Sequence, residues 1–323
     1  MNSRVKSFSL IATALLSLTV VGVHAAPVSS ATSALSGRFV SKMAAVRVNP
    51  HKIPSVAGRI KEYPVMTYTP VSKIDTLNEN RLADEISYGV YMIENSRGEN
   101  GRRAYSCQDR AFAGALVGKA LFAICDGHGT YGERIAQEVI KKFPLDVLKH
   151  KNSDQAIAGS CAQIQEQYRK MSHAQRSGTT LVCGVIQDKK LTVGNAGDSR
   201  LVLIRPSRSS IVLSTTDHKG DQKRTGLALS RSLGDVEAHQ KYGLTARPDV
   251  SQIELEDGDL IVLASDGYWD VLTNQQTASL VFQGLNQGLD CKDLAKMLAE
   301  KAHGLGSRDD ISVLCVRYKK TSA

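Results

Sequence analysis

Residues 120–129 read ALFAICDGHG, and residues 259–270 read DLIVLASDGYWD. In both, an apolar run of strand length ends on Asp-Gly, so each run is predicted to be a buried β-strand with an aspartate at its end. The glycine that follows permits the sharp turn such a position requires. Two strands of this kind could point Asp126 and Asp266 at one spot.

Short apolar segments separated by turn residues extend outward from these two runs, beginning at Ile86. The segments ISYGVYMIEN, AFAGALVG and ALFAICDG are predicted to be consecutive antiparallel strands, because Gly-rich turns separate them. Helical spacing predicts helices at 131–150, which Pro144 kinks or divides, and at 153–171. The pattern continues with strands TTLVCGVIQD, KLTVGNAG, SRLVLIRP, SQIELE, DLIVLASD and ISVLCVRY and with helices at 274–287 and 290–303.

Strands in blocks and helices in pairs favour an α+β layered fold over alternating βαβ units. The expected organisation is a signal peptide at 1–25, a basic leader at 26–84 and one catalytic domain at 85–320. Arg4 and Lys6, an apolar stretch and small residues ending at Ala25 form the export signal. The apolar stretch is shorter than the roughly 20 residues of a spanning helix.

We therefore expect cleavage after Ala25, a mature chain without a stable membrane span, and a secreted, periplasmic or extracellular location. The leader lacks sustained periodicity and is expected to be flexible, either as a solvated linker or as a segment that touches an anionic surface. The six cysteines show no paired spacing. Buried free thiols are therefore expected rather than a disulfide framework.

The formal charge of +9 is not gathered into one basic run, and aromatic residues make up only 5% of the chain. A base-stacking surface is therefore not expected, and no nucleic-acid partner is predicted. The positive balance instead favours an acidic or phosphorylated partner.

Acidic residues stand where predicted strands begin or end: Asp109 in SCQDR, Asp126 in CDGHG, Asp198 in NAGDSR, Asp266 in ASDGYWD, and Asp309 with Asp310 in SRDDIS. Any one of them alone is typical turn chemistry. Together they predict a bound cation, because crowded carboxylates repel each other unless a positive charge lies between them. Oxygen donors without His or Cys at metal spacing favour Mg²⁺ or Mn²⁺ over Zn²⁺.

Two residues directly after Asp126 add to this chemistry. Gly127 has no side chain, so its carbonyl can approach a metal closely. His128 stands beside the predicted cluster and is a candidate proton donor, because histidine exchanges protons near neutral pH.

Seven motifs in order carry a family resemblance: CDGHG, SGTT at 177–180, NAGDSR, LALSRSLGD at 227–235, ARPDV, LASDGYWDVL and SRDDISV. Over about residues 86–318 the chain resembles the metal-dependent serine/threonine protein phosphatases of type 2C. The resemblance implies an αββα sandwich, in which two antiparallel sheets are flanked by helix pairs, with a binuclear metal site at one end.

Carried over by position, the resemblance implies that Asp126 bridges two metal ions and that the Gly127 carbonyl binds one of them. Asp266 and Asp309 would complete the coordination of the other ion. The implied ions are Mg²⁺ or Mn²⁺, two in number and possibly a third.

The remaining roles also come from the resemblance. Asp109 would act through a metal-bound water, and Asp198 would help hold a third, weaker ion. Water activated between the ions would attack phosphoserine or phosphothreonine in a protein substrate, and His128 would protonate the departing oxygen. We expect the chain to act as a monomer.

The sequence departs from the family pattern around the first motif aspartate. Gln108 stands where the family has Glu, which is expected to weaken metal affinity. Ala104 stands where the family has its phosphate-binding Arg; either a bulge restores Arg103 to that role or another cation serves. Asp310 replaces a frequent Asn, so Asp309 and Asp310 could exchange roles.

Only residues 220–226 remain where the family has a long flap, which predicts a more open cleft and broad or unusual substrate use. These departures keep an alternative open, an exported pseudophosphatase that binds a partner without turnover. The SGTT hydroxyls are expected to be structural and Trp269 to lie in the core. His218 and His239 are expected at the surface, and Arg231 and Asp235 to brace the site or a nearby loop.

Overall fold

The structure, a computed structural model, describes residues 66–68, 85–94, 107–116, 118–148 and 150–320. All of them belong to one compact unit, Met43–Ala323. The predicted signal peptide and Arg103 lie outside the described residues, as does nearly all of the predicted leader.

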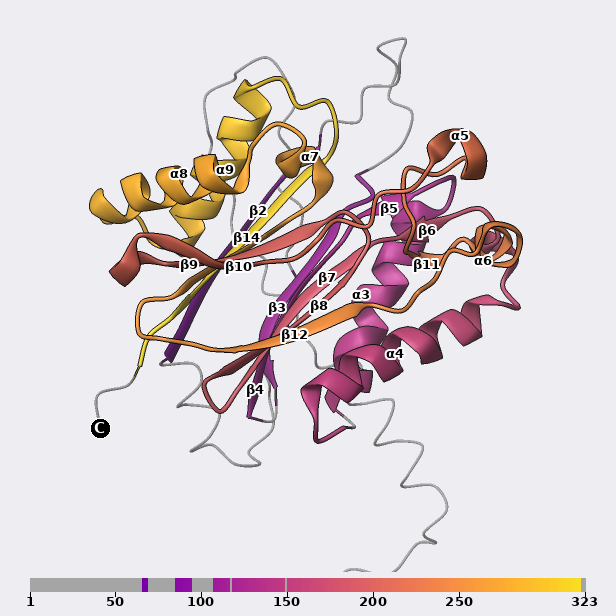
Figure 1. Cartoon of the computed structure of the whole chain (residues 1–323), viewed down its shortest axis with the longest axis horizontal. Coiled ribbons are helices and arrows are strands. Elements are labelled where there is room, and N and C mark those ends of the chain that lie inside the picture. Colours follow the sequence, from indigo (N-terminus) through magenta and orange to yellow (C-terminus); the bar gives the residue numbers. More distant parts are fainter. Residues whose placement is uncertain (1–65, 69–84, 95–106, 117, 149, 321–323) are drawn as a thin grey trace, which may run out of the picture. The chain divides into compact units, whose positions relative to one another are not determined.

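Two sheets form the centre of this unit (Figure 1). The six-stranded sheet has the order β1-β3-β4-β7-β8-β12, with strands at Met66–Tyr68, Arg110–Leu116, Lys119–Cys125, Leu181–Gln187, Lys190–Ala196 and Asp249–Glu254. The five-stranded sheet has the order β10-β9-β13-β14-β2, with strands at Ser210–Ser214, Arg200–Arg205, Leu260–Ala264, Ile311–Tyr318 and Ile86–Ile93. Neighbouring strands are antiparallel except β1, which pairs parallel with β3.

Helix pairs cover the outer faces of the sheets (Figure 1). Helices α3 (Gly132–Leu148) and α4 (Ser153–Tyr168) share a buried apolar cluster with β3, β4 and β7. Helices α8 (Asn274–Asn286) and α9 (Cys291–Gly304) share another with β13 and β14. A third cluster, containing Phe122 and Leu263, lies between the two sheets. The predicted αββα sandwich is confirmed.

The two apolar runs that end on Asp-Gly, at residues 120–129 and 259–270, are continuous because both faces of their strands are covered. Every residue of β4 is buried: Leu121 and Ala123 pack toward the helices, whereas Phe122 and Ile124 pack toward the second sheet. The prediction of buried free thiols is also confirmed, since all six cysteines are buried and unpaired.

One detail of the predicted topology is wrong, and one of two predicted alternatives is excluded. Strand β2 does not precede β3 in one meander; it pairs with β14, and the register joins Ile86 to Tyr318. Pro144 does not divide its helix, because α3 continues through it to Leu148. In addition, three residues of the predicted leader form β1, in which Met66 pairs with Phe112.

A small third sheet escaped the sequence analysis because its strands have two residues each and so carry no periodicity. Its order is β11-β6-β5, with strands at Leu233–Gly234, Gly178–Thr179 and Gly127–His128. Short helices α5 (Gln222–Thr225), α6 (Val236–Tyr242) and α7 (Asp266–Trp269) complete the regular elements near the strand ends. Of the helices that the structure describes, none combines the length and apolar character needed to cross a bilayer.

A buried ion pair fixes the far end of the five-stranded sheet and gives a stability prediction. Arg205 donates from Nε and Nη2 to both carboxylate oxygens of Asp259, at 2.9 and 2.8 Å, and Asp259 is fully buried. Arg205→Met would leave a buried charge unpaired, so it should lower the free energy of unfolding by about 3–5 kcal/mol. Urea unfolding measures this value.

Arg208→Met is the matched control, because Arg208 is 64% exposed and its ion pair is with Glu256 at the surface. Its cost should stay below about 1 kcal/mol. Equal costs for the two variants would contradict the assignment of the buried pair.

Candidate active site

The sheet register brings the two Asp-Gly turns and their neighbours to one end of the sandwich. Arg110 pairs with Cys125, so Asp109 and Asp126 emerge side by side at the ends of β3 and β4. Ala264 pairs with Val313, which places the start of α7 beside the residues that precede β14. Each aspartate predicted from sequence thus lies at an end of a strand that is buried in the sandwich.

Asp109 ties the two sheets together. It is 1% exposed, and its Oδ2 accepts hydrogen bonds from Ser265 Oγ at 2.8 Å and Ser312 Oγ at 2.7 Å. Burial, and next the charge of Asp310, raise the pKa of its carboxyl well above the usual range. Its Oδ1 is buried and has no hydrogen-bond partner among the described residues. One oxygen therefore holds the sandwich, and the other is left for a ligand.

Asp126 and Asp266 lie near enough for each to influence the pKa of the other. Burial and then the charges of Asp109, Asp266 and Asp309 raise the pKa of Asp126. Burial and then the charges of Asp198 and Asp309 raise the pKa of Asp266 to about 7. Asp266 Oδ1 is also buried without a partner among the described residues. Such crowding is relieved when a cation binds between the carboxylates.

The SGTT motif holds the backbone of Asp126. Thr179 Oγ1 and the backbone N–H of Thr180 both donate to the Asp126 carbonyl, at 3.0 and 2.8 Å, while Thr180 Oγ1 accepts from the Asp126 N–H at 3.1 Å. The structural role predicted for these hydroxyls is confirmed. Gly127 must lack a side chain, because a Cβ there would collide with the backbone of Gly132.

Asp198 differs from these carboxylates because the chain supplies its counter-charge. It is 3% exposed, and its Oδ2 accepts from Lys219 Nζ at 2.8 Å. The ammonium also lies 3.9 Å from Asp270 Oδ1. Burial opposes the charged form of Lys219, yet the bond and charge of Asp198 outweigh it, so the pKa of Lys219 is raised. A lysine cation thus lies where the resemblance implies a third, weaker ion.

Asp309 and Asp310 differ in burial and in their hydrogen-bond partners. Asp309 is exposed, and its Oδ1 accepts from the N–H of Asp310 at 2.8 Å. Asp310 is buried, and its Oδ2 accepts from the backbone N–H of Gln108 at 3.0 Å. The Gln108 side chain donates to the Gly129 carbonyl at 2.9 Å. Asp310 and Gln108 are therefore engaged within the chain, which favours Asp309 as the ligand of the pair.

These residues fit a hard divalent cation in their chemistry. All the donors are oxygens, and buried oxygens without partners call for an ion or water. Across the part of the chain that the structure describes, no three acidic, His or Cys side chains are already gathered tightly enough to hold a metal.

His128 lies at the edge of the cluster on β5. Its Nε2 is 2.6 Å from Asp235 Oδ2, and the same oxygen accepts from Ser232 Oγ at 2.6 Å. Burial would lower the pKa of His128, but the charge and hydrogen bond of Asp235 outweigh burial, so that pKa is raised. The sequence did not decide whether Arg231 and Asp235 brace the site or a nearby loop. Asp235 contacts the site.

Arg231 holds a loop instead, because it donates to the Arg247 carbonyl at 2.9 Å and to Asp249 Oδ1 at 2.6 Å. The prediction that His218 lies at the surface is wrong: its side chain is buried, with Nδ1 accepting from the Gly197 N–H at 3.2 Å. Its Nε2 donates to Asp249 Oδ2 at 3.0 Å, which ties the turn before Asp198 to the same loop.

His239 is half-buried rather than at the surface, and its Nε2 donates to the Ser232 carbonyl at 3.1 Å. Trp269 is 6% exposed and donates from Nε1 to the Ala264 carbonyl at 3.0 Å, so its predicted place in the core is confirmed.

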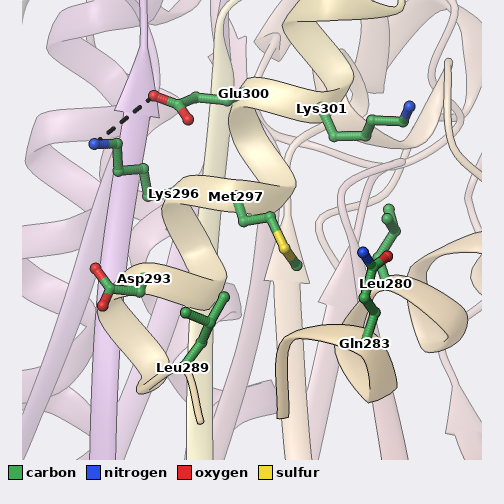
Figure 2. A pocket seen from close by; sticks show the side chains of 8 residues that line it. All are labelled: Leu280, Gln283, Leu289, Asp293, Lys296, Met297, Glu300 and Lys301. Atoms are coloured by element: carbon green, nitrogen blue, oxygen red, sulfur yellow. Dashed lines mark ion pairs between the residues drawn. The ribbon is translucent and has the colours of Figure 1, made fainter. Parts of the chain in front are cut away.

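A groove between α8 and α9 contains none of the predicted site residues. It has a volume of about 560 Å³, and Figure 2 shows its apolar side chains beside the ion pair of Lys296 with Glu300. Its lining is Leu280, Gln283, Leu289, Asp293, Lys296, Met297, Glu300 and Lys301. The charges there are mixed and exposed, so the chemistry of the molecule belongs to the strand ends.

An αββα sandwich whose strands end on crowded carboxylates, with a histidine held beside them, is compatible with metal-assisted hydrolysis. The family model for protein phosphatase 2C matches residues 100–225 and 220–311. The chain therefore belongs to the protein phosphatase 2C family and is a metal-dependent protein phosphatase by class.

Its relatives agree with this assignment. "Probable protein phosphatase 2C 59" of Oryza sativa subsp. japonica is 32% identical over 234 residues, covering 64% of this chain and 68% of that protein. "Probable protein phosphatase 2C 61" of Arabidopsis thaliana is 27% identical over 249 residues, covering 62% and 76%.

Solved structures share the fold. The S. agalactiae serine/threonine phosphatase superposes with a TM-score of 0.58 at 21% identity, covering 73% of this chain and all of that one. The catalytic domain of the serine/threonine protein phosphatase PstP, in complex with two manganese ions, gives 0.54 at 22% identity, covering 73% and 99%.

The crowded carboxylates predict an unusual pH dependence for the metal-free protein. The folded pKa of Asp266, about 7, lies above its unfolded value near 3.8. The protonated group therefore favours folding, and that stability is present below about pH 4 and lost as the pH rises through about 7. In EDTA, Asp266→Asn should flatten this loss and melt above the wild type at pH 7.5, as measured by thermal unfolding.

Adding Mn²⁺ should reverse the order, because the wild type gains stability from a bound ion and Asp266→Asn gains less. Identical melting curves for the two proteins in EDTA across pH 4–8 would contradict the electrostatic account of the cluster.

Proposed function

We propose that the chain hydrolyses phosphoserine and phosphothreonine in proteins, with Mg²⁺ or Mn²⁺ bound among Asp109, Asp126, Asp266 and Asp309. The observation that carries the proposal is the pair of buried, unpartnered carboxylate oxygens of Asp109 and Asp266 at one end of the sandwich. Carboxylates placed in this way, with raised pKa values, match a site built for divalent cations.

In this proposal Asp126, the Gly127 carbonyl, Asp266 and Asp309 would hold the ions. When bound, the ions would lower the pKa of a coordinated water and offset negative charge on the phosphoryl oxygens. Asp109 would accept from a coordinated water through Oδ1, because its Oδ2 is occupied by two serines.

Two side chains of this chain would act on the substrate rather than on the ions. His128 would give a proton to the departing serine or threonine oxygen, because an alkoxide is a poor leaving group. Arg103 stays the predicted phosphate-binding residue. Lys219 is the alternative cation, since its ammonium already lies among the carboxylates.

Two ions are favoured over three at this site. Asp198 is already paired with Lys219, so a third ion would have to displace an ammonium group before it could bind. A competing function, a pseudophosphatase that binds a partner without turnover, is favoured by the displaced Arg, by the shortened flap and by Gln108, whose amide is engaged with the Gly129 carbonyl.

The proposal predicts metal-dependent turnover by the chain from Ala26. With Mn²⁺ it should hydrolyse p-nitrophenyl phosphate and a phosphothreonine peptide, and EDTA should abolish both activities. Asp126→Asn should lower kcat by about 10²–10³-fold, the usual loss when one electrostatic stabiliser of a transition state is removed. Release of p-nitrophenol and of inorganic phosphate measures the two reactions.

Asp188→Asn is the matched control, because it makes the same chemical change at an exposed turn of positive φ, which asparagine tolerates. Its activity should equal that of the wild type. No turnover with Mn²⁺, or full turnover by Asp126→Asn, would sink the enzymatic proposal and favour the binding role.

We infer in addition that the chain is exported and that the catalytic unit acts outside the cytoplasm. The support is the signal pattern of Arg4, Lys6 and the small residues up to Ala25. Mass spectrometry of the protein recovered from an expressing cell's exported fraction should give a chain that begins at Ala26. An uncleaved chain confined to the cytoplasm would contradict the export proposal and leave the catalytic one intact.

A further inference from the structure

The small third sheet places the side chain of Asp235 against the ring of His128. In this sheet His128 pairs with Gly178, and Gly178 pairs in turn with Gly234 on its other side. Asp235 follows Gly234 and reaches back across the sheet to the imidazole. Three motifs far apart in the sequence, CDGHG, SGTT and SRSLGD, thus meet at a single side-chain contact.

The contact is short and buried. His128 Nε2 and Asp235 Oδ2 are 2.6 Å apart, and the Asp235 side chain is 2% exposed while that of His128 is 23% exposed. Ser232 Oγ donates to the same oxygen at 2.6 Å. A carboxylate only accepts, so the imidazole must carry its hydrogen on Nε2. Its Nδ1 makes no hydrogen bond within the described residues, and His128 is the more exposed side chain of the two.

The backbone of Asp235 is strained in a way that a capping role does not require. Asp235 precedes α6, yet its side chain makes no capping hydrogen bond to that helix. Its φ is 43°, in the left-handed region that favours glycine. Strain of this kind persists only where surrounding contacts fix it, and it points to a function for the side chain.

Those surrounding contacts are specific. The Asp235 N–H donates to the Ser177 carbonyl at 2.9 Å. Gln165 clamps Gly234 from both sides, accepting from its N–H and donating to its carbonyl, each at 2.8 Å. Gly178 must be glycine, because a Cβ there would collide with the Asp235 carboxylate. The chain thus leaves space for one carboxylate at one position.

We propose that Asp235 is a positioning residue, which holds the His128 ring with Nε2–H toward itself so that Nδ1 faces the substrate. The inference rests on the phosphatase function proposed above. His128 acts in its imidazolium form, which carries hydrogen on both nitrogens. As the water oxygen bonds to phosphorus and the bond to the leaving oxygen breaks, the electron pair stays on the leaving oxygen, which takes the Nδ1 proton and leaves a neutral ring with Nε2–H. The attacking water loses its own proton to solvent, and solvent returns a proton to His128.

Comparing two substrates distinguishes proton donation to the leaving group from the other steps of the reaction. A threonine oxygen needs a proton as it leaves, whereas p-nitrophenolate leaves readily without one. Asp235→Asn should therefore lower kcat on a phosphothreonine peptide by about 10²-fold, the usual size of general-acid catalysis. On p-nitrophenyl phosphate the loss should stay within about 3-fold, a small part of the same general-acid effect. KM should change little for either substrate.

His128→Ala should give the same selective loss, and the double variant should be no worse than His128→Ala alone, because the two residues act as one unit. Glu237→Gln is the matched control: it also converts a carboxylate to an amide, two positions away, but its partners are Arg176 and Lys241 at the surface. Both of its activities should equal those of the wild type. Equal losses on both substrates, or additive losses in the double variant, would overturn the proposal.

A spectroscopic measurement keeps the inference testable if the wild type shows no turnover, a result that would remove the proposed function itself. In protein labelled with ¹⁵N-histidine, the neutral His128 ring should show hydrogen on Nε2 and a bare Nδ1. The His128→Ala variant assigns the signal. In Asp235→Asn the preference for this tautomer should be lost. A wild-type ring with hydrogen on Nδ1 would overturn the placement whatever the activity.

Discussion

Repulsion between buried carboxylates is the constraint on which the rest of this structure depends. Antiparallel pairing brings Asp109 and Asp126 to neighbouring strand ends, and the packing of the two sheets adds Asp266. Burial, and then the charges of neighbouring carboxylates, raise the pKa of all three. The same Asp109 joins the sheets through Ser265 and Ser312, so the sandwich cannot form without creating the crowded site.

The chain offsets only part of this repulsion by itself. Lys219 neutralises Asp198, and backbone N–H groups occupy one oxygen each of Asp309 and Asp310. Asp109 and Asp266 keep buried oxygens without partners among the described residues. In the proposed function a divalent cation would offset the remaining repulsion, so stability and catalysis would depend on the same ion.

Strands and strand-end residues could be predicted where the sequence pattern itself reflects the local burial of the chain. Continuous apolar runs such as β4 identify strands covered on both faces, and an aspartate after such a run marks a strand end. Prediction from sequence failed where the cause is distant. The pairing of β2 with β14 is set by packing across more than 200 positions, and His218 is buried because a backbone N–H of Gly197 needs its Nδ1.

Asp235 illustrates the same limit at the site itself. The sequence left open whether Asp235 braces the site or a nearby loop, and an aspartate directly before a short helix is also typical of a helix cap. What redirects it is a combination no local window contains: the left-handed backbone of Asp235, the space left by Gly178 and the clamp of Gln165 on Gly234. Each of these three features is unfavourable or neutral for stability when considered separately. Together they hold the Asp235 carboxylate against the His128 imidazole. Local strain that survives with so many supports is best explained by the contact it maintains.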